Sequence, residues 1–144
     1  MKDVLTWYSL KRHPFDKSIR AAKILDNGPM RECSARLDYI KRRGGIMLLT
    51  GDPGVGKTLA LRRFADALPD NRFRPVYTPL STLKGTDILR HISDRIGLQP
   101  RATKSSLYTQ IQHEILESKD QRGSTIALII DEAQLLPVPT LHEL

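Results

Sequence analysis

Residues 46–58 constrain the fold more than any other stretch. An apolar run, Ile46–Thr50, leads into a glycine-rich loop, and the loop opens a helical pattern. The loop fits G-x-x-x-x-G-K-[ST], the signature of a phosphate-binding loop. Glycine has no Cβ and tolerates positive φ, so the backbone can curl and point successive N–H groups at an anion. Nucleotide contacts are therefore expected from the run Gly51, Asp52, Pro53, Gly54, Val55, Gly56, Lys57, Thr58 and Leu59.

Two side chains at the end of the loop have specific expected roles. Lys57 is expected to reach the β- and γ-phosphates of ATP, and the Thr58 hydroxyl is expected to ligate Mg²⁺. A chance glycine-rich turn is the alternative. It would not require an apolar strand before the loop and a helix after it, and this sequence supplies both.

A second motif follows the apolar run 126–130, which ends in Asp131 and Glu132. A buried parallel strand delivers such acids to the edge of the sheet where ligands bind. Asp131 is expected to hold Mg²⁺ through its water shell, and Glu132 to orient or deprotonate the water that attacks the γ-phosphate. The pair favours ATP hydrolysis over kinase chemistry. The alternatives are a helix cap after a strand, and a first-turn acid that serves only the helix dipole.

The remaining patterns predict an α/β domain with a largely parallel sheet. The run 46–50 is expected to be a strand covered on both faces, because it is apolar throughout. Pro75 and Pro79 place the strand over 73–80 at an edge. Expected helices and strands alternate at 30–43 (helix), 46–50 (strand), 57–68 (helix), 73–80 (strand), 86–96 (helix), 105–119 (helix) and 125–130 (strand), with a helix-like segment over 135–144.

Local signals predict how several of these helices begin, end and pack. Asn27-Gly28-Pro29 is expected to form a turn, and Gly44-Gly45 to end the helix over 30–43. Thr86 is expected to cap the helix over 86–96, and Ser105 or Ser106 the helix over 105–119. Apolar residues at helical spacing are expected to form one face of each of these two helices: Ile88, Leu89, Ile92 and Ile96 on the first, and Leu107, Ile111, Ile115 and Leu116 on the second.

Composition sets limits on partners and location. The chain has 144 residues, room for one domain, and a net charge of +7, which is compatible with DNA or RNA but equally with ATP alone. No apolar run approaches the ~20 residues of a membrane span, and the N-terminus has no signal-peptide pattern. Cys33, the sole cysteine, cannot form an internal disulfide. A cytoplasmic protein is expected.

Together the two motifs and their spacing resemble the AAA+ ATPases. The N-terminal Trp7-Tyr8-Ser9-Leu10, then Pro14-Phe15, is similar to the bacterial AAA+ transposition regulators encoded beside transposases, and secretion-accessory ATPases share this opening. The resemblance implies a three-layer P-loop fold. It divides the chain into an arm, 1–28, that flanks the nucleotide, and an ATPase core, 29–144.

The resemblance also implies partners. Family members assemble as rings or helical filaments on double-stranded DNA, which here points at Thr82, Lys84, Thr86 and Lys104 as DNA contacts and at a transposase as the protein partner. The alternatives are a secretion- or cell-wall-associated accessory ATPase and a non-hydrolysing nucleotide-binding fragment. The family's module continues for about a hundred residues after the second motif, with a sensor residue, an arginine finger, a lid and a strand between the two motif strands. None follows Leu144, so we expect the 144 residues alone to bind nucleotide weakly and hydrolyse it poorly.

Overall fold

The computed structural model describes residues 4–11, 13, 27–79 and 85–142 of the chain. The chain divides into two compact units, Met1–Asp66 and Ala67–Leu144. The glycine-rich loop belongs to the first unit and the acidic pair to the second.

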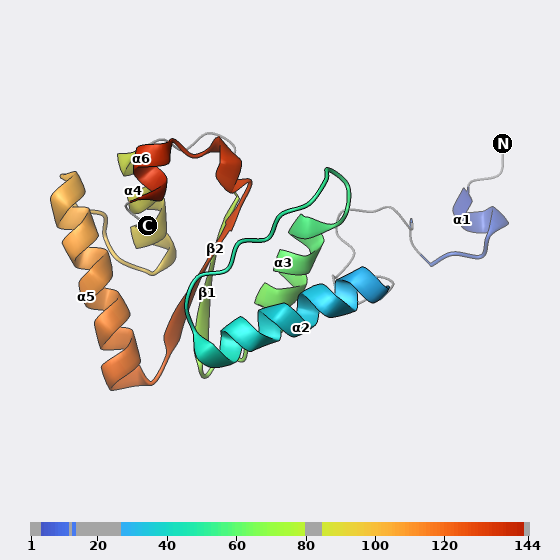
Figure 1. The fold of residues 1–144 in the computed structure, drawn as a ribbon, viewed down its shortest axis with the longest axis horizontal. Helices are drawn as coiled ribbons and strands as arrows, with labels where there is room; N and C mark the ends of the chain where they lie inside the picture. Colours follow the sequence, from blue (N-terminus) through green and yellow to red (C-terminus); the bar gives the residue numbers. More distant parts are fainter. Residues whose placement is uncertain (1–3, 12, 14–26, 80–84, 143–144) are drawn as a thin grey trace. The chain divides into compact units, whose positions relative to one another are not determined.

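The first unit contains α1 (Val4–Trp7), α2 (Gly28–Arg43) and α3 (Lys57–Asp66). The Asn27 side chain accepts a hydrogen bond from the Met30 N–H at 3.0 Å and so caps the start of α2. Asn27-Gly28-Pro29, which the sequence predicts as a turn, is therefore the beginning of the helix, where proline is well tolerated. Gly44, at φ 72°, ends α2 as predicted. Helices α2 and α3 pack together (Figure 1), with Leu37 and Ala60 buried.

The predicted strand over 46–50 is wrong for the described structure. The segment has no strand assignment, and the side chains of Ile46 and Leu48 are 96% and 78% exposed. A strand exists only where its N–H and C=O groups meet a partner. Among the described residues the two strands present pair with each other, and neither pairs with this segment. The apolar composition predicts that the segment is buried, but the side chains of Ile46 and Leu48 are exposed in the described structure.

The second unit is a parallel two-stranded sheet covered by helices. Strand β1 (Phe73–Pro79) pairs with β2 (Thr125–Asp131) in register from Phe73 opposite Thr125 to Pro79 opposite Asp131. Helices α4 (Thr86–Arg95) and α5 (Lys104–Arg122) pack on each other, and they contact β1 and β2 respectively (Figure 1). The short η2 (Ala133–Leu135) and α6 (Val138–Leu141) follow β2. The predicted α/β class and parallel pairing are confirmed.

The core of this unit forms between the sheet and the two helices. The buried face of α4 is the predicted one, and Val76 of β1 and Leu107 of α5 meet it. The prediction for α5 is partly wrong. Ile115 and Leu116 are exposed, while Glu114 and Ser118 are buried, because the inward face repeats at 107, 111, 114 and 118. The α4 residues in the core are Ile88, Leu89, Ile92 and Ile96.

Helix α5 begins one residue before the stretch where the sequence predicts its cap. Thr103, rather than Ser105 or Ser106, is the N-cap, and its hydroxyl accepts the Ser106 N–H at 3.3 Å. Threonine is also a favoured N-cap residue, although it ranks below serine, so three residues of the run Thr-Lys-Ser-Ser could serve as the cap. Within the described ranges, no helix is both long and apolar enough to cross a bilayer.

Candidate nucleotide-binding site

The glycine-rich loop depends on backbone conformations that other residues rarely adopt. Gly51, Gly54 and Gly56 have φ angles of 156°, 82° and 97°. A Cβ added to Gly51 would lie 3.2 Å from Cγ2 of Val55, so a side chain there would press into the loop itself. These conformations let the loop curl.

Lys57 folds back over this loop. Its Nζ donates hydrogen bonds to the carbonyl oxygens of Gly51 at 2.8 Å and Asp52 at 3.0 Å. The ammonium group is thereby held beside the loop backbone, at the start of α3, where free N–H donors and the positive end of the helix dipole also lie. The arrangement gathers positive charge and backbone donors at one place, which is the environment a polyphosphate requires. Thr58, the next residue, lies in the first turn of α3.

The acidic motif lies at the carboxyl end of β2. Asp131 is the last residue of the strand and is 9% exposed. The Tyr77 hydroxyl donates a hydrogen bond of 2.6 Å to its Oδ2. Tyr77 pairs with Ile129, two residues before Asp131, so both side chains are on the same face of the sheet. No sequence signal singles out Tyr77, because its contact with Asp131 depends on the register of β1 against β2.

Glu132 follows in a left-handed backbone conformation, with φ 58° and ψ 37°. Its N–H donates to Oδ1 of Asp131 at 3.1 Å, and the Gln134 amide donates to its carboxylate. A glutamate in this region is conformationally costly, and such residues persist where the surroundings hold them in place. The turn exposes the Glu132 carboxylate while Asp131 stays buried. The two acids thus occupy different environments, one buried and one exposed.

The predicted DNA contacts are only partly within the described residues. Thr82 and Lys84 lie outside them. Thr86 is the first residue of α4, and Lys104 is the first residue of α5. Gly85, rather than Thr86, is the N-cap position of α4.

The residues present fit a magnesium nucleotide. In the first unit, the loop supplies glycine backbone and a lysine for phosphates, and Thr58 carries a hydroxyl oxygen. In the second unit, Asp131 carries a carboxylate, and oxygen ligands of both types are those that Mg²⁺ prefers. The buried carboxylate of Asp131 is already oriented by Tyr77. The fold and these groups define a P-loop nucleotide-binding domain of the α/β class.

Comparison with known proteins identifies the family. A family model described as an AAA domain matches residues 40–144, and the chain belongs to this family. The chain is therefore a nucleotide-binding domain of the ATPase type. It is also 33% identical over 97 residues to the DNA repair protein RadA of Brucella abortus (strain 2308). That match covers 65% of this chain and 20% of the relative. No solved structure matches the chain.

Proposed function

We propose that this protein is a magnesium-dependent ATPase that works on double-stranded DNA. The observation that carries the proposal is the glycine loop with Lys57 clamped across it, because this arrangement concentrates donors and positive charge where phosphates bind. The acidic pair after β2 supports hydrolysis beyond simple nucleotide binding.

The chain's own residues have separate tasks in this mechanism. Lys57 exchanges its carbonyl partners for phosphate oxygens of the bound nucleotide and neutralises charge on them. Thr58 and Asp131 would hold Mg²⁺, which supplies charge neutralisation at the phosphates when bound. Glu132 accepts a proton from the attacking water, or orients that water by a hydrogen bond. Gln134 keeps the Glu132 carboxylate in position through its amide.

The DNA partner is supported by two observations. The chain carries a net charge of +7, which favours a polyanion, and the name of the Brucella relative places that protein in DNA repair. Thr82, Lys84, Thr86 and Lys104 are our proposed contacts to phosphates. A homo-oligomer, as a ring or helical filament, and a transposase as its target are further proposals. They rest on the similarity of the N-terminal arm to transposition regulators.

Replacing Glu132 with Gln tests the hydrolytic step. In an ATPase the variant binds ATP, retains it and stays assembled on DNA, whereas the wild-type protein releases phosphate and dissociates. Asp94→Asn is the matched control, since it makes the same carboxylate-to-amide change on the exposed surface of α4. Phosphate release and DNA retention are measured with ATP and Mg²⁺. Equal behaviour of Glu132→Gln, the control and wild type would refute hydrolysis and favour a nucleotide-dependent binding module.

A further inference from the structure

The positive charge of the chain is confined to one unit. Residues 1–66 contain 14 Lys and Arg against seven Asp and Glu, whereas residues 67–144 contain nine of each. The first unit therefore accounts for the whole net charge of +7. Charge asymmetry of this kind suggests a surface for a polyanion. The DNA contacts proposed above, at 82–86 and 104, all lie in the electrically neutral second unit.

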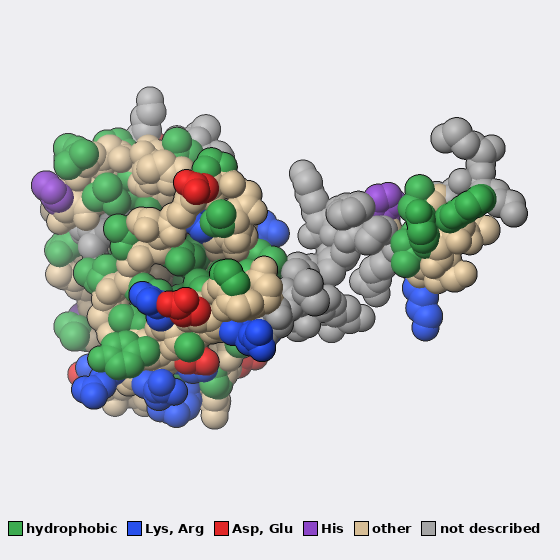
Figure 2. Space-filling view, turned by 45° about the vertical axis from the view of Figure 1, so that its right-hand side comes forward, with side chains coloured by type: hydrophobic (Ala, Val, Ile, Leu, Met, Phe, Trp, Pro, Cys, Tyr) green, Lys and Arg blue, Asp and Glu red, His purple; other side chains and the backbone are tan. Residues whose placement is uncertain are grey.

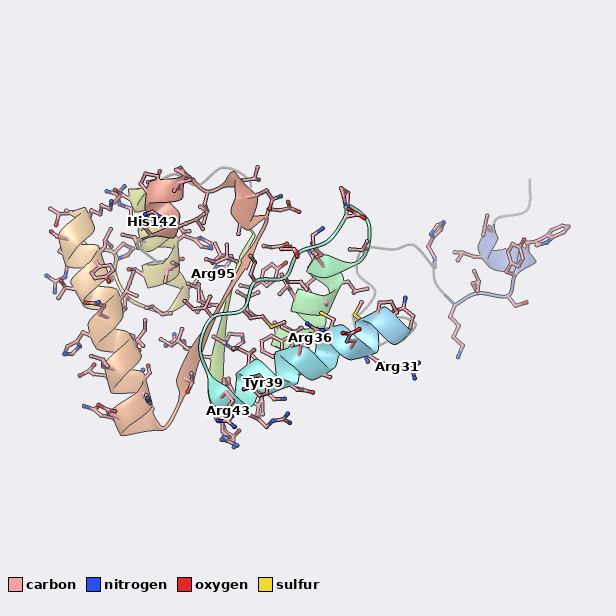
Figure 3. All side chains as sticks on the ribbon, viewed as in Figure 1. Arg31, Arg36, Tyr39, Arg43, Arg95 and His142 are labelled. Atoms are coloured by element: carbon pink, nitrogen blue, oxygen red, sulfur yellow. The ribbon has the colours of Figure 1, made fainter. Side chains whose placement is uncertain are left out.

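Within the first unit, the exposed face of α2 gathers basic side chains. At 100° per residue, positions 31, 36, 39, 42 and 43 fall on one side of the helix, opposite the buried Leu37. Figure 3 places the labelled side chains of this face along the length of α2, and Figure 2 shows Lys and Arg side chains gathered at the lower part of the molecular surface. We name this set the α2 basic face; it consists of Arg31, Arg36, Tyr39, Arg42 and Arg43.

The acids of α2 pair with only one arginine of this face, Arg36. Glu32 pairs with Arg36 at 2.6 Å, and Asp38 pairs with Lys41 at 2.8 Å. No carboxylate within the described ranges pairs with the three remaining arginines of the face. Arg43 instead lies over the Tyr39 ring, 5.9 Å from its centroid, which holds its guanidinium beside an exposed aromatic. The arginines without a carboxylate partner are Arg31, Arg42 and Arg43.

The position of Arg31 is informative. It lies in the first turn of α2, which contains no acid, and a cation there opposes the helix dipole. Arg42 and Arg43 suit the C-terminal end of a helix on dipole grounds alone, but Arg31 does not. A bound anion along the helix would offset this cost at Arg31. From Arg31 to Arg43 the helix rises about 18 Å, the axial length of about five base pairs of duplex DNA.

We propose that the α2 basic face is a second DNA-binding surface, which contacts the phosphates of a duplex through Arg31, Arg42 and Arg43. Arginine suits phosphate because its planar fork donates two parallel hydrogen bonds. A membrane surface fits less well, since the face presents no Leu, Ile, Phe or Trp to insert into lipid. The inference rests on the DNA partner of the proposed function, but it requires neither ATP binding nor hydrolysis.

The test is a titration of the full 144-residue chain into a fluorescein-labelled DNA duplex without nucleotide. Fluorescence anisotropy of the labelled duplex reports binding. The triple variant Arg31→Gln, Arg42→Gln, Arg43→Gln is compared with Arg72→Gln, Arg95→Gln, Lys119→Gln, which removes three exposed cations from the second unit. We expect the α2 variant to bind at least about tenfold more weakly. For this variant, the slope of log affinity against log salt concentration should become shallower by about 2.7, because each of the three lost phosphate contacts contributes about 0.9 to the slope. Circular dichroism of both variants checks that the fold is retained.

The outcomes separate this inference from the proposed ATPase. Equal affinity of the two triple variants, or no duplex binding by wild type at about 50 mM salt, overturns the α2 basic face. Tighter binding to phosphatidylserine vesicles than to the duplex overturns it in favour of a lipid surface. Lys57→Ala is expected to bind nucleotide at least about tenfold more weakly and to keep nucleotide-free duplex binding. If wild type binds the duplex through α2 but binds no ATP, the proposed function fails and this inference stands.

Discussion

The contact between Tyr77 and Asp131 gives a sharp prediction, because a single oxygen can be removed. In Tyr77→Phe the ring remains in β1, and the 2.6 Å hydrogen bond to Oδ2 of Asp131 is lost. Hydrogen bonds to charged groups contribute about 1.5–3 kcal/mol, and Asp131 is 9% exposed, so water replaces the lost donor poorly. We expect the free energy of unfolding to fall by about 1.5–3 kcal/mol and the Tm by about 4–10 °C.

The same variant should alter the magnesium requirement. The hydroxyl of Tyr77 orients the Asp131 carboxylate, and residues that orient a metal ligand typically affect metal affinity by about tenfold or more. The Mg²⁺ concentration for half-maximal ATP binding should therefore rise by about tenfold. A merely structural role would lower stability and leave this midpoint unchanged.

Urea unfolding followed by circular dichroism measures the first effect, and a Mg²⁺ titration of fluorescent ATP-analogue binding measures the second. Tyr108→Phe is the matched control, since it removes a hydroxyl from an exposed tyrosine on α5 of the same unit. If Tyr77→Phe matches Tyr108→Phe in both measurements, the hydrogen bond to Asp131 contributes neither to stability nor to the magnesium requirement.

Three further predictions follow from other contacts. Gly56→Ala places a Cβ on a residue with φ 97° and should lower the free energy of unfolding by about 1–2 kcal/mol. It should also weaken ATP binding at least about tenfold, as measured by calorimetry, and wild-type affinity would contradict this. Glu114→Gln removes the charge that pairs with Arg122 at 2.7 Å and Arg74 at 3.6 Å. The free energy of unfolding in urea should fall by about 1–2 kcal/mol, a value reduced by the exposure of both arginines; an unchanged unfolding midpoint would be inconsistent with the pairing. Burial raises the pKa of the Cys33 thiol, against an opposing effect of Arg36, so the thiol stays protonated at neutral pH. Cys33 should therefore react with iodoacetamide faster in urea than in the folded chain, and equal rates would show that the fold does not protect the thiol.

Much of the fold could be predicted from local signals. The amphipathic face of α4 and the apolar run of β2 each have one dominant pattern, and both elements form where the sequence predicts them. Gly44 ends α2 because a helix terminus with positive φ favours glycine. Such features depend on nearby residues, which the sequence displays directly.

The wrong predictions concern contacts between residues that are distant in the chain. Ile46–Thr50 has the composition of a buried strand, but strand formation needs a hydrogen-bonding neighbour, and none is present in the described ranges. On α5, the presence of Glu114 in the core follows from Arg74 of β1 and Arg122, which pair with it. A sequence pattern cannot supply such pairings.

The candidate site divides in the same way. The glycine loop and the acidic pair follow from motif spacing. The Tyr77 contact instead requires the parallel register that sets Tyr77 opposite Ile129. The left-handed turn at Glu132 and its Gln134 partner likewise follow from the way β2 ends. These contacts orient the acids, and only the folded chain displays them.

Calorimetric titration of ATP with Mg²⁺ into wild type and Lys57→Ala tests whether the glycine loop binds nucleotide through Lys57. The Lys57 ammonium group donates hydrogen bonds to the glycine loop, at the carbonyl oxygens of Gly51 and Asp52. We expect saturable binding by wild type and at least about tenfold weaker binding by the variant, since charge-assisted bonds to phosphate contribute about 1.5–3 kcal/mol. Equal affinities for the two proteins, or no binding by wild type, would contradict it.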